Sequence, residues 1–171
     1  MRNGKPEGQP IESAGDNLFG NGWKFRFNLR PAQPGAMYLM NVGLGKNNTN
    51  EYNVLFPLPR DNKVDARVMA EQTAQTDWLR FVEQTGVEKL WLIWTAEPIA
   101  ALNTIFEEAG RNRDAPGVIT NPEHIAYIQT LLKQYEAAPP ENRTDKASKL
   151  TLVKGHSEVL VNLIQLSHEA Y

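Results

Sequence analysis

The chain has 171 residues, a hydrophobic fraction of 41% and a charged fraction of 22%, which are ordinary values for one folded domain and argue against wholesale disorder. A globule of this length buries roughly 70% of the surface that its unfolded chain exposes, so it can build a sizeable core. The formal net charge of −2 provides no strong attraction for nucleic acid or an anionic membrane, the lack of cysteine excludes disulfides and thiolate chemistry, and no apolar run approaches the ~20 residues of a membrane span.

A loop-like lead-in precedes the first regular pattern. Residues 1–22 are rich in Gly, Pro and Asn, which predicts irregular structure. They contain no signal peptide, because Arg2 and Lys5 are followed by Pro, Gly and Glu and not by an apolar segment. Met1 followed at once by Arg-Asn-Gly-Lys-Pro looks like a cut through a longer polypeptide, so we expect the folded domain to span residues 23–171.

Three stretches with the two-residue period of β-strands come next. Residues 23–29 alternate apolar and polar side chains, which predicts a strand with one buried face. Residues 36–42 are apolar on both faces apart from Asn41. Residues 51–58 carry Pro57, which places that strand at a sheet edge or ends it there, because proline donates no ladder hydrogen bond.

The stretch from Val87 to Trp94, V-E-K-L-W-L-I-W, is the hydrophobic centre of the chain. From Leu90 onward both alternating faces are apolar, which is typical of a central strand with material packed on both sides. A buried helix is the alternative, but the shortness of the run and its β-forming residues favour a strand. Short strands at 66–69 and 77–82 precede it, and a turn ending at Gly86 predicts that 77–82 is its antiparallel hairpin neighbour.

After the central strand the period changes to the 3.6 residues of a helix. Residues 98–110 predict one helix that ends at Gly110, since glycine is a common C-terminal stop. Residues 121–135 predict a second helix with Asn121 as its N-cap.

The remaining segments complete the predicted fold. Residues 137–146 read as a mobile linker, and 149–153 with 158–166 predict a final hairpin that turns at Gly155-His156. The chain is therefore expected to be mostly β: an antiparallel immunoglobulin-like β-sandwich of about 7–8 strands, with a two-helix insertion at 98–136 before the C-terminal hairpin.

Six segments in one order carry a family resemblance: W-K-F-R-F-N-L, P-G-A-M-Y-L-M-N-V-G, N-V-L-F-P-L-P, T-D-W-L-R-F, G-V-E-K-L-W-L-I-W-T-A-E-P and V-L-V-N-L-I-Q-L-S-H. This order resembles a bacterial domain of unknown function that is often attached to the C-terminal side of serine/threonine protein kinases, and sometimes to caspase-like peptidases. The match covers residues 20–100 and 148–168, whereas 101–147 are less typical. The resemblance implies an accessory β-sandwich, in many kinases past a transmembrane helix and therefore extracytoplasmic. It supplies no catalytic residues and no cofactor, and the chain contains no kinase motif.

Four residues are the candidate ligand contacts. Trp78 and Trp94 are the aromatic residues that we expect to be partly exposed, because most of the others are in phase with core aliphatic residues. Glu88 lies on the strand face of Trp94, where an unpaired buried carboxylate is costly, so we expect it to pair with Arg80 on the preceding strand. Trp78, Trp94, Arg80 and Glu88 are thus the predicted ligand-binding set.

The metal candidates are Asp61 and Asp65, whose carboxylates together with Asn62 offer oxygen ligands for Ca²⁺. They lack the spacing of a calcium loop, so a solvated turn is favoured. The three histidines, His124, His156 and His168, lie on different expected elements without metal-ligand spacing, and two of them with a carboxylate are the zinc alternative.

These features favour a non-catalytic sensing or interaction domain of a bacterial signalling protein, with a protein, peptide or glycan as its ligand. One alternative is a hydrolase that uses a carboxylate pair near Asp61, Asp65 and Glu88. The other is a structural spacer, or a homodimer formed by edge-strand pairing.

Overall fold

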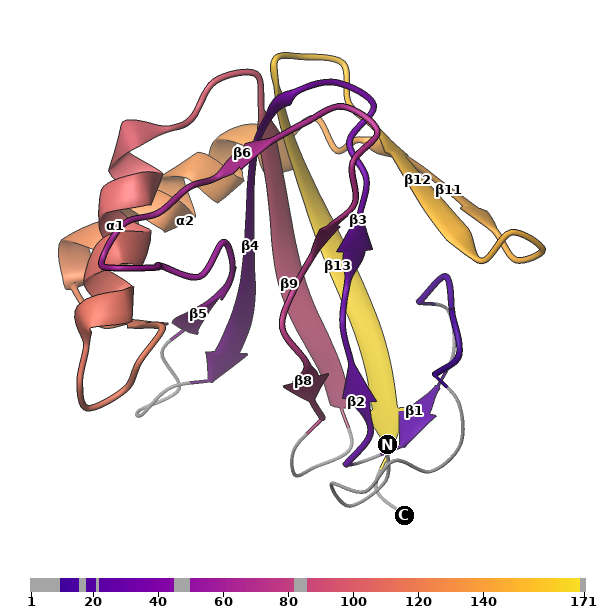
Figure 1. Ribbon diagram of the computed structural model, residues 1–171, viewed down its shortest axis with the longest axis horizontal. Helices are drawn as coiled ribbons and strands as arrows, with labels where there is room; N and C mark the ends of the chain where they lie inside the picture. Colours follow the sequence, from indigo (N-terminus) through magenta and orange to yellow (C-terminus); the bar gives the residue numbers. More distant parts are fainter. Residues whose placement is uncertain (1–9, 16–17, 21, 45–49, 82–85, 170–171) are drawn as a thin grey trace.

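The computed structural model describes residues 10–15, 18–20, 22–44, 50–81 and 86–169. Its centre is a seven-stranded sheet with the spatial order β1-β13-β9-β4-β5-β10, in which β6 also pairs with β4 (Figure 1). The strands of this sheet are β1 (Phe19–Gly20), β4 (Gly35–Leu44), β5 (Asn50–Phe56), β6 (Arg67–Val68), β9 (Gly86–Thr95), β10 (Val118–Ile119) and β13 (Val159–Glu169). All neighbouring pairs are antiparallel except β1 with β13.

Strand β9 is central, as the sequence predicts. It lies between β13 and β4, and its alternating side chains enter two separate cores. Ile93 packs on one face, whereas Leu90 and Leu92 pack on the other. The predicted end of the third strand at Pro57 is also confirmed, because β5 ends at Phe56.

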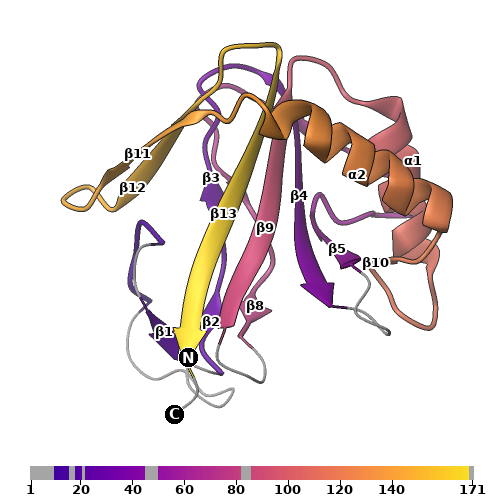
Figure 2. The ribbon, with the colours of Figure 1, turned by 180° about the vertical axis from the view of Figure 1, so that it is seen from behind.

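One face of the sheet is covered by the two helices, α1 (Ala100–Arg111) and α2 (Pro122–Glu136). Figure 2 shows α2 crossing in front of the strands with α1 beside it. The buried helix residues Leu102, Ile105, Phe106, Ile128 and Leu132 pack against sheet residues from β4, β5, β9, β10 and β13. The periodicity of both helices therefore predicts their buried stripes correctly.

The other face is covered by what we call the covering ribbon, the chain from residue 22 to 29 together with the chain from 74 to 81. It contains the pairs β2 (Lys24–Phe25) with β8 (Leu79–Arg80) and β3 (Asn28–Leu29) with β7 (Ala74–Gln75). Lys24 pairs with Arg80 and Asn28 with Gln75, so one extra residue on the second strand makes a bulge between the two pairs. The inner side chains of the ribbon join Leu39, Leu90 and Leu92 in the second core.

The remaining pair forms an exposed projection that we call the arm, β11 (Glu141–Asp145) with β12 (Leu150–Lys154). Both views show the arm pointing away from the sheet (Figures 1 and 2). The predicted linker at 137–146 is therefore wrong in its second half, which is β11. Its five residues are all exposed and polar, so no apolar period marks them as a strand.

Two predicted hairpins are also wrong. The stretch 77–82 does not pair with β9; its strand β8 pairs with β2 in the covering ribbon. The segments 149–153 and 158–166 do not pair with each other either, because β12 pairs with β11 and β13 pairs with β9. Sequence neighbours were expected to pair, whereas the long apolar strands gain more buried area by pairing with one another.

The predicted mostly β character is confirmed, but the immunoglobulin-like sandwich is not. The structure has one large sheet with helices on one face, and the two-residue strands of the ribbon on the other face stand in separate two-stranded sheets. The described strands also outnumber the 7–8 expected, because the pattern at 23–29 is divided into β2 and β3, and because β1, β7, β10 and β11 lie outside the predicted strands.

The helix ends follow partly from local sequence. Asn121 caps α2 as predicted, with its side-chain oxygen accepting a hydrogen bond from the Glu123 amide at 2.9 Å. Gly110 is not the stop of α1, which continues to Arg111. A Cβ at Gly110 would lie 2.5 Å from Cγ of Pro59, so this glycine permits the loop after β5 to pack closely on the helix.

The start of α1 is capped from the sheet rather than by its own side chain. The N-cap Ile99 offers no side-chain acceptor; instead the buried Tyr38 hydroxyl on β4 accepts from the Ile99 amide at 3.0 Å and donates to Asn103 Oδ1 at 2.8 Å. Tyr38 also packs edge to face on Phe106 of the same helix.

We expect Tyr38→Phe to lower the free energy of unfolding by about 1–3 kcal/mol, because it removes the hydroxyl partner of two half-buried groups, the Ile99 amide and Asn103 Oδ1. Burial raises the pKa of Tyr38, so above about pH 10 the unfolded chain loses this proton before the folded chain does, and stability falls as pH rises. Urea unfolding of both chains from pH 8 to 11 checks this. The free energy of unfolding should fall less steeply with pH in Tyr38→Phe than in the wild type. Equal slopes in the two chains would contradict the role given to Tyr38.

Candidate functional site

The outer face of the covering ribbon carries a cluster that we call the basic–aromatic face: Lys24 and Arg26 from one strand, Trp78 and Arg80 from the other. Lys24 and Arg80 are directly opposed across the strand pair, and the next outward positions on each strand are Arg26 and Trp78. The alternation of the strands directs Phe25 and Phe81 inward to the second core and these four side chains outward. The site therefore lies on the outer surface of the ribbon, with the second core beneath it.

Trp78 and Arg26 form the aromatic half of this face. The Arg26 guanidinium carbon lies 4.9 Å from the Trp78 ring centroid, which is a cation–π contact. Trp78 is 46% exposed, a large exposure for an indole. The prediction that Trp78 is partly exposed is confirmed.

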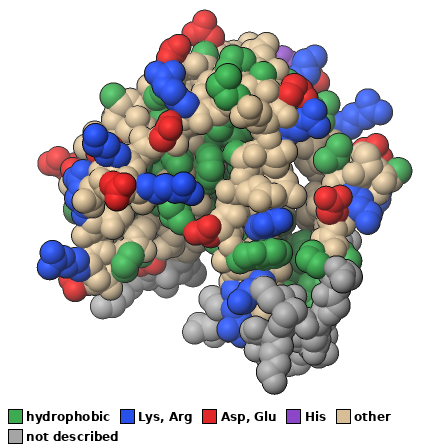
Figure 3. Space-filling view, in the orientation of Figure 1, with side chains coloured by type: hydrophobic (Ala, Val, Ile, Leu, Met, Phe, Trp, Pro, Cys, Tyr) green, Lys and Arg blue, Asp and Glu red, His purple; other side chains and the backbone are tan. Residues whose placement is uncertain are grey.

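Lys24 and Arg80 form the charged half. Like charges directly opposite in an antiparallel pair destabilise the ribbon, and within the described residues no carboxylate forms an ion pair with Lys24, Arg26 or Arg80. The exposed Asp77 beside Trp78 offsets one of the three positive charges. Figure 3 shows Lys and Arg side chains around exposed hydrophobic surface over this ribbon. Such an arrangement attracts an anionic group from solution.

Trp94 is not part of this surface. Its indole is half-buried in the second core beneath the covering ribbon, and the indole nitrogen is buried without a hydrogen-bond partner among the described residues. A Cβ at Gly35 would lie 2.9 Å from this ring, so the backbone of β4 approaches it closely. The structure gives Trp94 a packing role and separates it from Trp78.

The predicted pairing of Glu88 with Arg80 is wrong. The Glu88 carboxylate accepts a hydrogen bond from Asn41 Nδ2 at 2.8 Å and lies 3.5 Å from Nε2 of His168. Asn53 donates in turn to Asn41 Oδ1 at 3.5 Å. These four side chains form a polar row across β5, β4, β9 and β13, on the sheet face that the covering ribbon also occupies.

His168 is the buried end of this polar row. It is 4% exposed, its ring stacks on Phe81 at 5.1 Å, and its Nδ1 has no hydrogen-bond partner among the described residues. Glu88 lies inside the row, between Asn41 and His168, and its side chain is 30% exposed, so solvent reaches its carboxylate. The row thus keeps a carboxylate beside an imidazole at the border of the second core.

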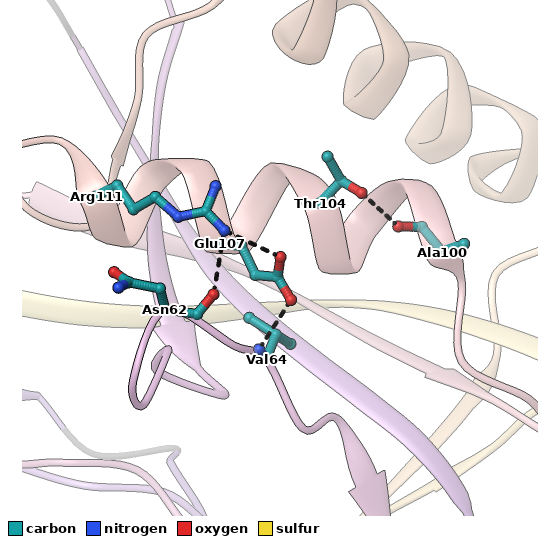
Figure 4. A network of polar contacts seen from close by, with 6 residues as sticks. All are labelled: Asn62, Val64, Ala100, Thr104, Glu107 and Arg111. Atoms are coloured by element: carbon teal, nitrogen blue, oxygen red, sulfur yellow. Dashed lines mark hydrogen bonds and ion pairs between the residues drawn. The ribbon is translucent and has the colours of Figure 1, made fainter.

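The metal candidates Asp61 and Asp65 lie in a loop that is fastened to α1. Glu107 accepts a hydrogen bond from the Val64 amide at 3.2 Å, and Arg111 bridges Glu107 and the Asn62 carbonyl (Figure 4). Asp65 accepts from the Arg67 amide of its own turn. In the described ranges no group of three His, Asp or Glu side chains is placed to hold a metal ion.

A small cavity of about 90 Å³ lies between α1, β10 and the start of α2. It contains the half-buried His124, whose Nδ1 is 3.5 Å from the Glu108 carboxylate. His156 pairs similarly with Glu141 at the exposed base of the arm. Each of the three histidines therefore has a different carboxylate neighbour, as their separate placement in the sequence suggests.

Sequence reasoning found two members of the basic–aromatic face and missed Lys24 and Arg26. Their signal was available, since both are outward positions of an alternating strand, but only the pairing with β8 brings them beside Trp78 and Arg80. Asn41 was visible as the polar exception in an apolar strand. His168 was named only as one of the histidines of the zinc alternative; its place beside Glu88 was not predicted, because it depends on the β9–β13 register.

No helix in the described part of the chain is long and apolar enough to span a membrane. Comparison with protein-family models, with curated proteins and with solved structures finds no match, so the resemblance to the kinase-associated bacterial domain stays a prediction.

Proposed function

We propose that this chain is a non-catalytic interaction domain that binds an acidic segment of a partner protein on its basic–aromatic face. The observation that carries the proposal is the placement of Lys24, Arg26 and Arg80 around the exposed Trp78 without carboxylate partners in the described chain. The family resemblance supports the wider setting, a bacterial signalling protein in which this domain accompanies a catalytic one.

The chemistry of these residues favours a protein ligand. Tryptophan and arginine are the residue types that most often dominate the binding energy of protein interfaces, and cations select a partner of opposite charge. The ribbon that carries the face is supported by the second core, which favours binding because a rigid backbone loses less entropy when it binds. An acidic glycan is the second candidate, because Trp78 also offers a ring surface beside cations.

Titration with an octaglutamate peptide tests the proposal, with tryptophan fluorescence as the readout and an octalysine peptide as the charge control. We expect binding that weakens with salt and that Arg80→Glu weakens by about tenfold, which corresponds to about 1.4 kcal/mol. Arg113→Glu is the matched control, because Arg113 is exposed and the change in net charge is identical.

Two results would count against the proposal. Equal losses in Arg80→Glu and Arg113→Glu would mean that only net charge matters. Tight binding of a sulfated oligosaccharide together with no binding of octaglutamate would assign the face to a glycan.

A further inference from the structure

The arm is the part of the described chain least supported by the rest of the fold. An isolated two-stranded ribbon is marginally stable in water. Asn142 donates to Asn162 Oδ1 at 2.9 Å and Thr151 donates to the Ala14 carbonyl at 3.0 Å, so the face that carries these residues is turned to the body. The opposite face of the arm is turned to solvent.

That outer face presents two leucines. The leucines alternate along β12 with Thr151, which faces the body, so they lie on the opposite face of the strand. Leu150 is 64% exposed and Leu152 is 63% exposed. Their cross-strand partners on β11 are Asp145 and Arg143, and Lys154 faces Glu141. The apolar pair is thus framed by charges of both signs.

The sequence of β12 is complementary to itself in an antiparallel arrangement. If a two-fold axis passes Leu152, all five residues of the strand are paired: Leu152 faces Leu152 of the other copy, and Leu150 faces Lys154. Leu152 of one copy then lies directly opposite Leu152 of the other copy and diagonally opposite its Leu150. No like charges stand opposite each other on the two β12 strands, and Leu150 lies between Asp145 of its own copy and Lys154 of the other.

The same test rejects the other edge of the arm. If β11 paired with its own copy about Arg143, two arginines would be opposed, and Glu141 would face Asp145. Every charged pair on that face would be repulsive. Charge therefore distinguishes two edges that otherwise both expose backbone hydrogen-bonding groups.

We propose that the arm is a homodimerisation element in which β12 pairs antiparallel with β12 of a second copy, giving a four-stranded ribbon in which Leu150 and Leu152 of both copies lie side by side in one apolar cluster at the centre of the outer face. This interface is separate from the basic–aromatic face and holds whether or not an acidic ligand binds there.

Disulfide trapping tests the geometry directly, because the chain contains no cysteine. Leu152→Cys places one thiol beside the axis, where facing strand residues have Cβ atoms within about 5.5 Å, close to the separation that a disulfide needs. Arg143→Cys is the matched control on the same face of the arm. Under mild oxidation we expect the Leu152→Cys dimer to form at least about tenfold faster than the Arg143→Cys dimer. Equal rates, or a faster Arg143→Cys dimer, would overturn the proposal.

Sedimentation equilibrium supplies a readout without cysteine. The wild-type chain is expected to dimerise with concentration, and Leu152→Lys, which opposes two cations at the axis, is expected to remain monomeric with an unchanged melting temperature. A wild-type chain that stays monomeric up to about 1 mM overturns the proposal. So does a Leu152→Lys chain that dimerises as well as the wild type.

Discussion

Phe81→Ala is expected to lower the free energy of unfolding by about 3–5 kcal/mol, a large share of the 5–15 kcal/mol typical of a domain. Phe81 is 1% exposed and its ring stacks on Phe19, Phe25 and His168. Its backbone also pairs with the start of the ribbon, where the Phe81 amide donates to the Trp23 carbonyl at 3.1 Å. Removing the ring leaves a cavity between the ribbon and the sheet.

The matched control is Trp78→Ala, which removes a larger ring from the opposite face of the same ribbon. Because Trp78 is 46% exposed, we expect a change in stability well below that of Phe81→Ala. Denaturant unfolding followed by circular dichroism measures both. Similar losses in the two variants would mean that the second core does not hold the ribbon as described.

Gly35→Ala is the second change with a large expected effect. In an ordinary strand this substitution stabilises by up to about 1 kcal/mol, because alanine restricts the unfolded chain. At Gly35, however, the added Cβ would lie 2.3 Å from the Thr95 carbonyl oxygen and 2.9 Å from the Trp94 ring. Since one of these neighbours is backbone of β9, we expect a net destabilisation of about 1–3 kcal/mol.

Gly43→Ala is the control in the same strand. A Cβ at Gly43 would meet only Asn41 Oδ1 at 3.8 Å, an ordinary contact, so this variant should be neutral or slightly stabilised. Thermal unfolding of both variants decides the matter. A Gly35→Ala chain as stable as Gly43→Ala would show that β4 and β9 are not as close as this structure has them.

The local patterns of the sequence were sufficient to place most regular elements. Apolar residues on both faces of β9 predict its central position, because a strand with one wet face would alternate. The 3.6-residue stripes predict α1 and α2, and Asn121 marks the start of α2 because its side chain satisfies a free helix amide. Pro57 marks the end of β5 for an equally local reason, the missing donor.

The candidate site was predictable only in part. The exposure of Trp78 follows from its position out of phase with the core. The partner of Glu88 does not follow from the sequence, because Arg80 and His168 both lie at suitable alternating positions. Only the pairing of β9 with β13 brings His168 beside Glu88.

Sequence alone determined the long apolar strands and the two helices of this protein and the faces that they bury, because hydrophobic period and capping act within a few residues. It did not determine the short strands β1, β7 and β10 or the polar β11, which carry no such period. Tertiary structure alone decided which strands pair: β13 with β9, β8 with β2, and the all-polar β11 with β12. Backbone hydrogen bonds are the same for every partner, so pairing depends on how much apolar surface the whole chain can bury at once, and no single segment carries that information.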